Sequence, residues 1–143
     1  MKLIEEIAVV VYQKLTQSND VVTALSGGEI AYKRADYSKP GIIIIPHSSD
    51  GEGSVREGRI NVNIHVPDIH KGTASHSVYE LNFPKLIQLK KLAIEVLRRH
   101  YESDEGWNWA IDQMDSPIEE QGHNEHYCTL ILEVIIRDRT NKQ

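Results

Sequence analysis

The segment GHNEHYC, residues 122–128, gathers the densest set of potential metal ligands in this sequence. Four of its residues offer atoms that zinc binds: His123, Glu125, His126 and Cys128. Three upstream histidines could complete a tetrahedral shell: His65, His70 and His76. The segment is, however, typical of a loop that runs into a strand, and its histidine pair lacks the helical setting of a known zinc motif. We therefore predict a polar loop followed by a core strand, with no metal and no cofactor.

Other chemical signatures are missing from the sequence. The stretches SGGE and DGEGS lack the lysine and the spacing of a phosphate-binding loop. No paired Cys-x-x-Cys, nucleophile elbow or kinase signature is present, and the single cysteine rules out an internal disulfide. The formal net charge is −5, from 16 basic and 21 acidic residues. That balance argues against a dedicated duplex-DNA binder, so we predict no sequence-specific binding of nucleic acid.

The row of residues from 59 to 66 alternates strictly between polar and apolar side chains, as a half-buried β-strand does. One face carries Ile60, Val62, Ile64 and Val66, which we predict to be core. The other carries Arg59, Asn61, Asn63 and His65. That polar face could be a catalytic patch, solvated surface or a wall that a partner covers. No acid or nucleophile shares it, so we predict the wall.

Two tryptophans, Trp107 and Trp109, stand two residues apart in a stretch that is typical of a strand. They therefore share a face. Packing in the core and burial in an association surface are both open for this pair, because aromatic residues are enriched in both places. We include both tryptophans in the predicted protein interface.

The elements that must position these residues follow from periodicity and punctuation. We expect helices over about 2–17 and 80–101, the second with Pro84 in its first turn. We expect strands over 41–45, between Pro40 and Pro46, then from 59 to Pro67, over 106–114 and over 128–138. Polar loops should occupy 48–58 and 68–79. The prediction is a single α+β domain, residues 1–143, with an antiparallel-leaning sheet of about four or more strands and two main helices packed on one face.

Neither a signal peptide nor a membrane span is predicted. The apolar run from Ile7 to Val11 is short, and two acidic residues precede it. No stretch approaches the roughly 20 apolar residues that cross a bilayer. We expect a soluble protein that is made inside the cell and has no membrane partner.

Three stretches, taken in order, resemble a known family. They are VVTALSGGEIAY (21–32), KPGIIIIPH (39–47) and INVNIHVPD (60–68), followed by a long helix and two late strands. This arrangement is similar to the small tail-completion and tail-terminator proteins of long-tailed bacteriophages and prophages. The resemblance covers nearly the full chain, from about Leu3 to Asp138, and rests on hydrophobic patterns.

The resemblance implies a structural virion protein and not an enzyme. Members of that family assemble into a ring, commonly a hexamer, which caps the tail tube and forms the surface on which the head docks. The expected partners are other copies of the chain, the tail-tube protein and the head–tail connector. The expected location is the virion tail, after synthesis in the bacterial cytoplasm. Two other classes stay open: a metal-dependent enzyme that uses His123 and His126, and a monomeric adaptor or binding module.

Overall fold

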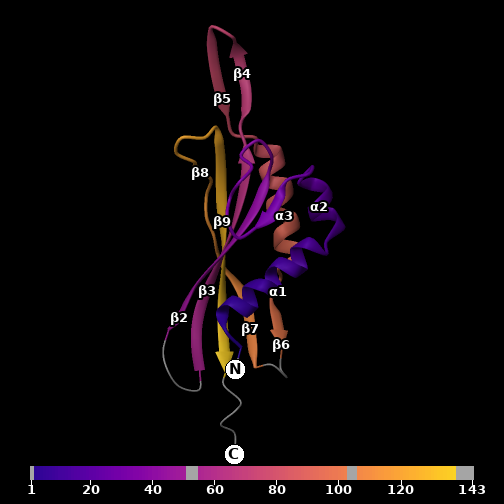
Figure 1. The fold of residues 1–143 in the computed structure, drawn as a ribbon, viewed down its shortest axis with the longest axis vertical. Coiled ribbons are helices and arrows are strands. Elements are labelled where there is room, and N and C mark those ends of the chain that lie inside the picture. Colours follow the sequence, from indigo (N-terminus) through magenta and orange to yellow (C-terminus); the bar gives the residue numbers. More distant parts are fainter. Residues whose placement is uncertain (1, 51–54, 103–105, 138–143) are drawn as a thin grey trace, which may run out of the picture.

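A computed structural model of the chain describes residues 2–50, 55–102 and 106–137. One mixed sheet carries three helices on one of its faces (Figure 1). The helices are α1 (Ile4–Thr16), α2 (Asn19–Ala24) and α3 (Phe83–Val96). The strands are β1 (Glu29–Ala31), β2 (Gly41–Asp50), β3 (Val55–Pro67), β4 (Ile69–Thr73), β5 (His76–Glu80), β6 (His100–Glu102), β7 (Trp107–Met114), β8 (Ile118–Glu119) and β9 (Glu125–Arg137).

The sheet has the strand order β1-β2-β3-β9-β7-β6, and β8 pairs with β9 beyond the end of β7. Every pairing in it is antiparallel except that of β1 with β2. The prediction of an α+β fold with an antiparallel-leaning sheet is thus confirmed at that level. The sheet is nevertheless mixed, and the helical layer holds a third helix, α2, that periodicity did not show.

The core lies between the helices and the two central strands, β3 and β9, each 13 residues long. Their register places Ile64 opposite Cys128 and Val62 opposite Leu130. The predicted core faces are confirmed, and the buried apolar residues that the two strands give to the core are Ile60, Val62, Ile64, Val66, Cys128, Leu130, Leu132, Val134 and Ile136. Alternation settles which residues these are, because successive side chains of a strand point to opposite faces.

The two long helices bury apolar stripes as their sequences predict, but α3 ends at Val96 and not near 101, because residues 100–102 form strand β6. The buried residues of α1 are Ile4, Ile7, Ala8, Val11 and Leu15, and those of α3 are Leu86, Leu89 and Ala93. The Asn82 side chain caps α3 by accepting from the Lys85 backbone N–H, and Pro84 lies in the first turn as expected. None of the helices in the described ranges is both long enough and apolar enough to cross a bilayer.

Strand β2 does not end at Pro46, as we had predicted, but runs on to Asp50. On one side, β2 pairs with β1, but only through its first three residues, Gly41 to Ile43. Beyond that point β2 is an edge strand within the described chain, and an edge strand tolerates proline because it need not donate on its open side. The predicted 48–58 loop is therefore wrong at both ends, and its centre, 51–54, lies outside the described residues.

The predicted loop over 68–79 is instead a β-hairpin, β4–β5, which projects beyond the sheet (Figure 1). We call residues 69–80 the arm. All ten of its strand residues are exposed, so no burial pattern distinguishes them from a loop in the sequence. Gly72 takes a φ of +97°, which favours glycine at this point.

Candidate functional site

The sheet face opposite the helices, which we call the outer face, carries the polar row of β3. Arg59 is exposed and Asn61 and Asn63 are half-buried, as a wall or a solvated surface would require. Asn63 accepts a 2.7 Å hydrogen bond from the Thr129 hydroxyl of β9. Asn61 stands between Ile45 of β2 and Ile131 of β9. On the outer face, the amide groups of β3 therefore lie beside isoleucines of the two neighbouring strands.

His65, at the end of this row, is buried, with 5 % of its surface exposed. Its Nδ1 lies 2.8 Å from Oε2 of Glu125, the first residue of β9. Because an ionised carboxylate only accepts, the imidazole Nδ1–H is the donor. The ring also stacks on Tyr127 with a centroid distance of 4.9 Å. His65 is therefore part of a buried polar cluster and not of an open wall.

Arg34 completes this cluster from the segment between β1 and β2. Its Nη2 donates to Oε1 of Glu125 at 2.7 Å and to the Lys39 carbonyl at 2.6 Å. Its Nη1 lies 3.2 Å from Oε2 of Glu29 in β1. We call Glu29, Arg34, His65 and Glu125 the latch, because they tie β1, the 32–40 segment, β3 and β9 together.

Gly41 lies directly beneath the guanidinium of the latch. A Cβ at this position would come within 2.2 Å of the Arg34 Nη1. Glycine is needed at the start of β2, because a larger residue there would clash with the side chain of Arg34.

The charges of the latch determine the protonation of Glu125. Burial by itself would raise the pKa of this carboxyl. Hydrogen bonds from His65 and Arg34, together with their charges, outweigh burial and lower the pKa of Glu125 below its ordinary value. The latch therefore holds an ionised carboxylate in a buried position, where its two oxygens are satisfied by separate donors.

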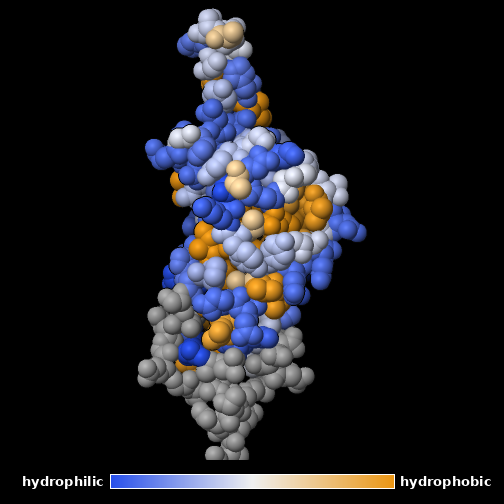
Figure 2. Space-filling model, in the orientation of Figure 1, coloured by the Kyte–Doolittle hydropathy of each residue, from blue (hydrophilic) through white to orange (hydrophobic). Residues whose placement is uncertain are grey.

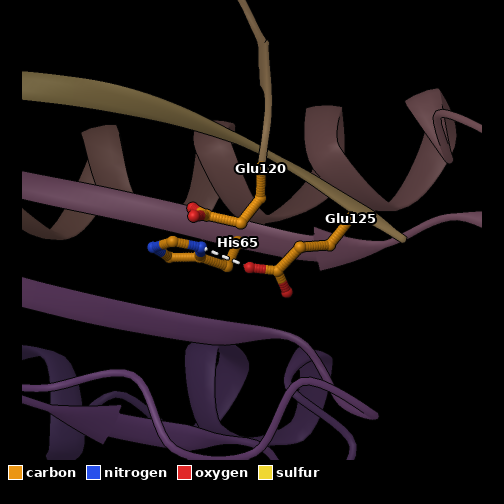
Figure 3. A group of neighbouring side chains, drawn as sticks. All are labelled: His65, Glu120 and Glu125. Atoms are coloured by element: carbon orange, nitrogen blue, oxygen red, sulfur yellow. Dashed lines mark hydrogen bonds and ion pairs between the residues drawn. The ribbon is translucent and has the colours of Figure 1, made fainter. Parts of the chain in front are cut away.

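A second carboxylate, Glu120, approaches the latch from the segment after β8 (Figure 3). His65, Glu120 and Glu125 each offer one ligand atom, and these atoms lie within 4.8 Å of one another. The Arg34 guanidinium, however, already occupies one oxygen of Glu125 at 2.7 Å. A cation bound here would sit beside this positive charge, so the donor set fits an ion-pair network better than a metal centre.

The four ligand candidates of residues 122–128 do not converge. His123 stacks on Tyr37 with a centroid distance of 3.6 Å, while His126 pairs with Asp68 at 2.6 Å. The Cys128 side chain faces the core and is fully buried, and burial raises the pKa of its thiol. Only Glu125 joins a potential ligand group among the described residues, and its neighbours there are His65 and Glu120. The predicted core strand is confirmed from Cys128 on, but β9 begins at Glu125, three residues before the predicted start, so the polar loop is shorter than expected.

The two tryptophans belong to the core in this structure. Trp107 is 4 % exposed and Trp109 fully buried, and the Trp109 indole donates to the Leu97 carbonyl at 3.3 Å. His100 stacks on both rings. Of the two alternatives that the sequence left open, core packing describes this pair, because its side of β7 faces the helices.

No family model matches this sequence, and no curated protein matches it. Two open surface hollows, of about 430 and 350 Å³, lie against α1 and between α2 and α3. Neither is lined by a residue of the latch. Apolar surface is also visible at the position of α2, where Val22 is 46 % exposed (Figure 2).

Sequence reasoning missed Glu29, Arg34 and Glu120. Arg34 lies in the polar stretch AYKRADY, which has no periodicity and no motif. Its partner Glu125 is 91 residues away in the chain, so no local pattern links the two. The one available signal was Gly41 at the start of an isoleucine strand, since glycine there often marks a close approach of another group.

Proposed function

We propose that this chain is a structural protein of a long-tailed phage or prophage, a tail terminator that closes the tail tube as a homo-oligomeric ring. The proposed ring is a hexamer. Its other partners are the tail-tube protein and the head–tail connector, and its place is the virion tail. The proposed role is assembly and not catalysis.

The observation that supports this proposal is the outer face of the sheet. All three helices lie on the opposite face (Figure 1), so this face has no helical layer among the described elements. Its centre is nevertheless only partly polar: Ile45 is 37 % exposed, and Ile131 and Ile135 are half-buried. The charged residues Arg59 and Glu133 lie opposite each other beside this centre. A centre of apolar groups and amides with charged residues next to it resembles a protein interface, whose core is depleted in charge and whose rim is polar.

The row of Arg59, Asn61 and Asn63 suits a neighbouring subunit better than a small ligand. Amide and guanidinium groups form directional hydrogen bonds, and the row adds only one formal charge. His65, which we had also placed in the wall, belongs instead to the latch. The latch supports this surface, because Arg34 holds the 32–40 segment against its edge.

The proposal is tested by the mass of the assembly in solution. Native mass spectrometry and light scattering should show a closed oligomer of the wild-type chain, either alone at high concentration or with tail-tube subunits of its own phage. A chain that stays monomeric under both conditions contradicts the proposal and favours a monomeric adaptor.

The wall itself is tested by Asn61→Lys. This residue lies on the outer face and is only half-buried, so the free energy of unfolding should change by no more than about 0.5 kcal/mol. In a ring the substitution would bury an unpaired lysine charge in every contact, and assembly should weaken by roughly tenfold or more. Thr23→Lys, on the exposed side of α2, is the matched control and should assemble normally. Normal assembly of Asn61→Lys would show that this face is solvated.

A further inference from the structure

The arm stands clear of the rest of the molecule (Figure 1), with all ten strand residues exposed. Within the arm, Lys71 and Glu80 form a 2.9 Å ion pair, and His70 lies against Tyr79. An exposed ion pair adds little stability. An isolated two-stranded hairpin is marginally stable in water. The contacts within the arm therefore add little to its stability.

The base of the arm is, in contrast, firmly held. The Asp68 backbone N–H donates to the Asn124 carbonyl at 2.8 Å. The Asp68 side chain, only 3 % exposed, lies 2.6 Å from Nδ1 of His126. These two contacts join the foot of the arm to the start of β9 and fix the direction in which the arm leaves the domain. A fixed direction lowers the entropy that docking would otherwise cost.

The arm exposes apolar side chains that nothing in its own domain covers. Ile69 and Val78 are 39 % and 46 % exposed and share one face, while Tyr79 is 47 % exposed on the other. Apolar surface is visible along the lower part of the arm (Figure 2). Both outer edges of the hairpin also carry backbone groups that can pair with another strand. Apolar area on a projecting strand pair is typical of a surface that another chain covers.

The same chain offers a surface of matching chemistry at the edge formed by β7 and β8. Strand β6 pairs with β7 only from Trp107 to Trp109, and β8 pairs only with β9 among the described strands. This edge exposes Met114 at 56 % and Ile118 at 49 %. The stretch 111–120 around them has no basic residue and four acidic ones: Asp112, Asp115, Glu119 and Glu120.

We infer that the arm of one copy docks along the β7–β8 edge of a second copy and extends its sheet. The apolar residues Ile69 and Val78 would cover Met114 and Ile118. The arm adds no net charge to the acidic stretch, because its one acid, Glu80, is paired with its one lysine, Lys71, while the chain as a whole carries −5. This inference rests on the proposed ring: arm and edge are different surfaces, so the contact is head-to-tail and closes a ring when the rotation allows.

The contact is tested by cross-linking Val78→Cys to Ile118→Cys with a short bis-maleimide. The wild-type thiol, Cys128, is fully buried and does not compete. The double variant should give a ladder of covalent oligomers that ends at the size of the ring. A mixture of the two single variants should stop at covalent dimers, and each single variant alone should stay uncross-linked. A control pairs Val78→Cys with Val9→Cys, an exposed position on α1, and should give no ladder.

The outcomes separate this inference from the proposed function. If the wild-type chain forms rings but the Val78 and Ile118 pair cross-links no better than the control, the arm docks elsewhere and the inference is wrong while the ring stands. Self-cross-linking of Val78→Cys alone would indicate a two-fold contact and also overturn it. Cross-linked chains that never associate with tail-tube subunits would support the arm contact and contradict the terminator. Thermal melting of each variant checks that it is folded.

Discussion

At the scale of single residues, the latch shows how a buried charge is kept in this fold. Glu125 has a fully buried side chain, and its two oxygens are bound by His65 and Arg34. Removing one member of a buried ion pair usually costs far more than the pair itself contributes, because the remaining charge stays buried without compensation. The latch is therefore sensitive to the loss of any member.

Glu125→Gln is the most direct test of the latch. We expect it to lower the free energy of unfolding by about 3 kcal/mol at pH 7, since it leaves Arg34 with one fewer carboxylate. Because the fold lowers the pKa of Glu125, its stabilisation is complete above the ordinary carboxyl pKa and is lost as pH falls through the lowered value.

Urea unfolding of the wild type and of Glu125→Gln between about pH 3 and pH 8 measures this effect. The difference between the two proteins should be constant near neutrality and shrink below about pH 4. Glu133→Gln, at an exposed position of the same strand, is the control. A difference that did not change with pH would mean that the charge of Glu125 does not stabilise the fold.

Alanine substitutions of His123 and His126 should have different effects on the free energy of unfolding. His126→Ala removes the partner of the buried Asp68 carboxylate and should cost about 1–3 kcal/mol. His123→Ala removes only an exposed ring that stacks on Tyr37 and should change stability by less than about 0.5 kcal/mol. Neither cost should depend on zinc or on a chelator. Stoichiometric zinc in protein purified without added metal would contradict this interpretation.

At the scale of elements, the two faces of the sheet formed by β2 and β3 should contribute unequally to the free energy of unfolding. Ile64 is fully buried beneath the helices, whereas Ile45, on the outer face of the neighbouring strand, is 37 % exposed. Truncation of Ile64 would lose buried apolar area and leave a cavity, whereas Ile45 has less buried area to lose.

Ile64→Ala should therefore cost about 2–5 kcal/mol, while Ile45→Ala should cost the isolated chain less than about 1 kcal/mol. Chemical denaturation at low protein concentration, where the chain is monomeric, measures both. Equal costs would contradict the assignment of the two faces. If a partner covers the outer face, Ile45→Ala should in addition weaken assembly.

At the scale of the whole molecule, the proposed contact surfaces lie at different positions along its long axis. The arm projects at one end, and the start of α1 and the end of β9 lie toward the other (Figure 1). The outer face and the β7–β8 edge lie between them. An elongated subunit with an arm, a receiving edge and a partly apolar wall offers distinct contacts in different directions, which closed rings and stacked assemblies both need. The mass and cross-linking experiments belong to this scale.

The sequence by itself determined the elements whose pattern is local. The alternation from Ile60 to Val66 and from Cys128 to Ile136 identified two core strands and their inner faces, because strand geometry alone sends successive side chains to opposite sides. The apolar stripes of α1 and α3 were equally legible, since helical spacing needs no knowledge of the partner. The fold class followed from the order of these elements.

Only the tertiary structure decided the rest. The latch joins residues as far as 91 positions apart, so its charges find one another only after the sheet has formed. The arm is a hairpin because its backbone groups pair, and exposed polar strands leave no periodic mark in a sequence. Both tryptophans proved to be core because the helices cover their side of β7. Pattern reveals which face of an element is apolar, but the packing of the whole chain decides what covers it.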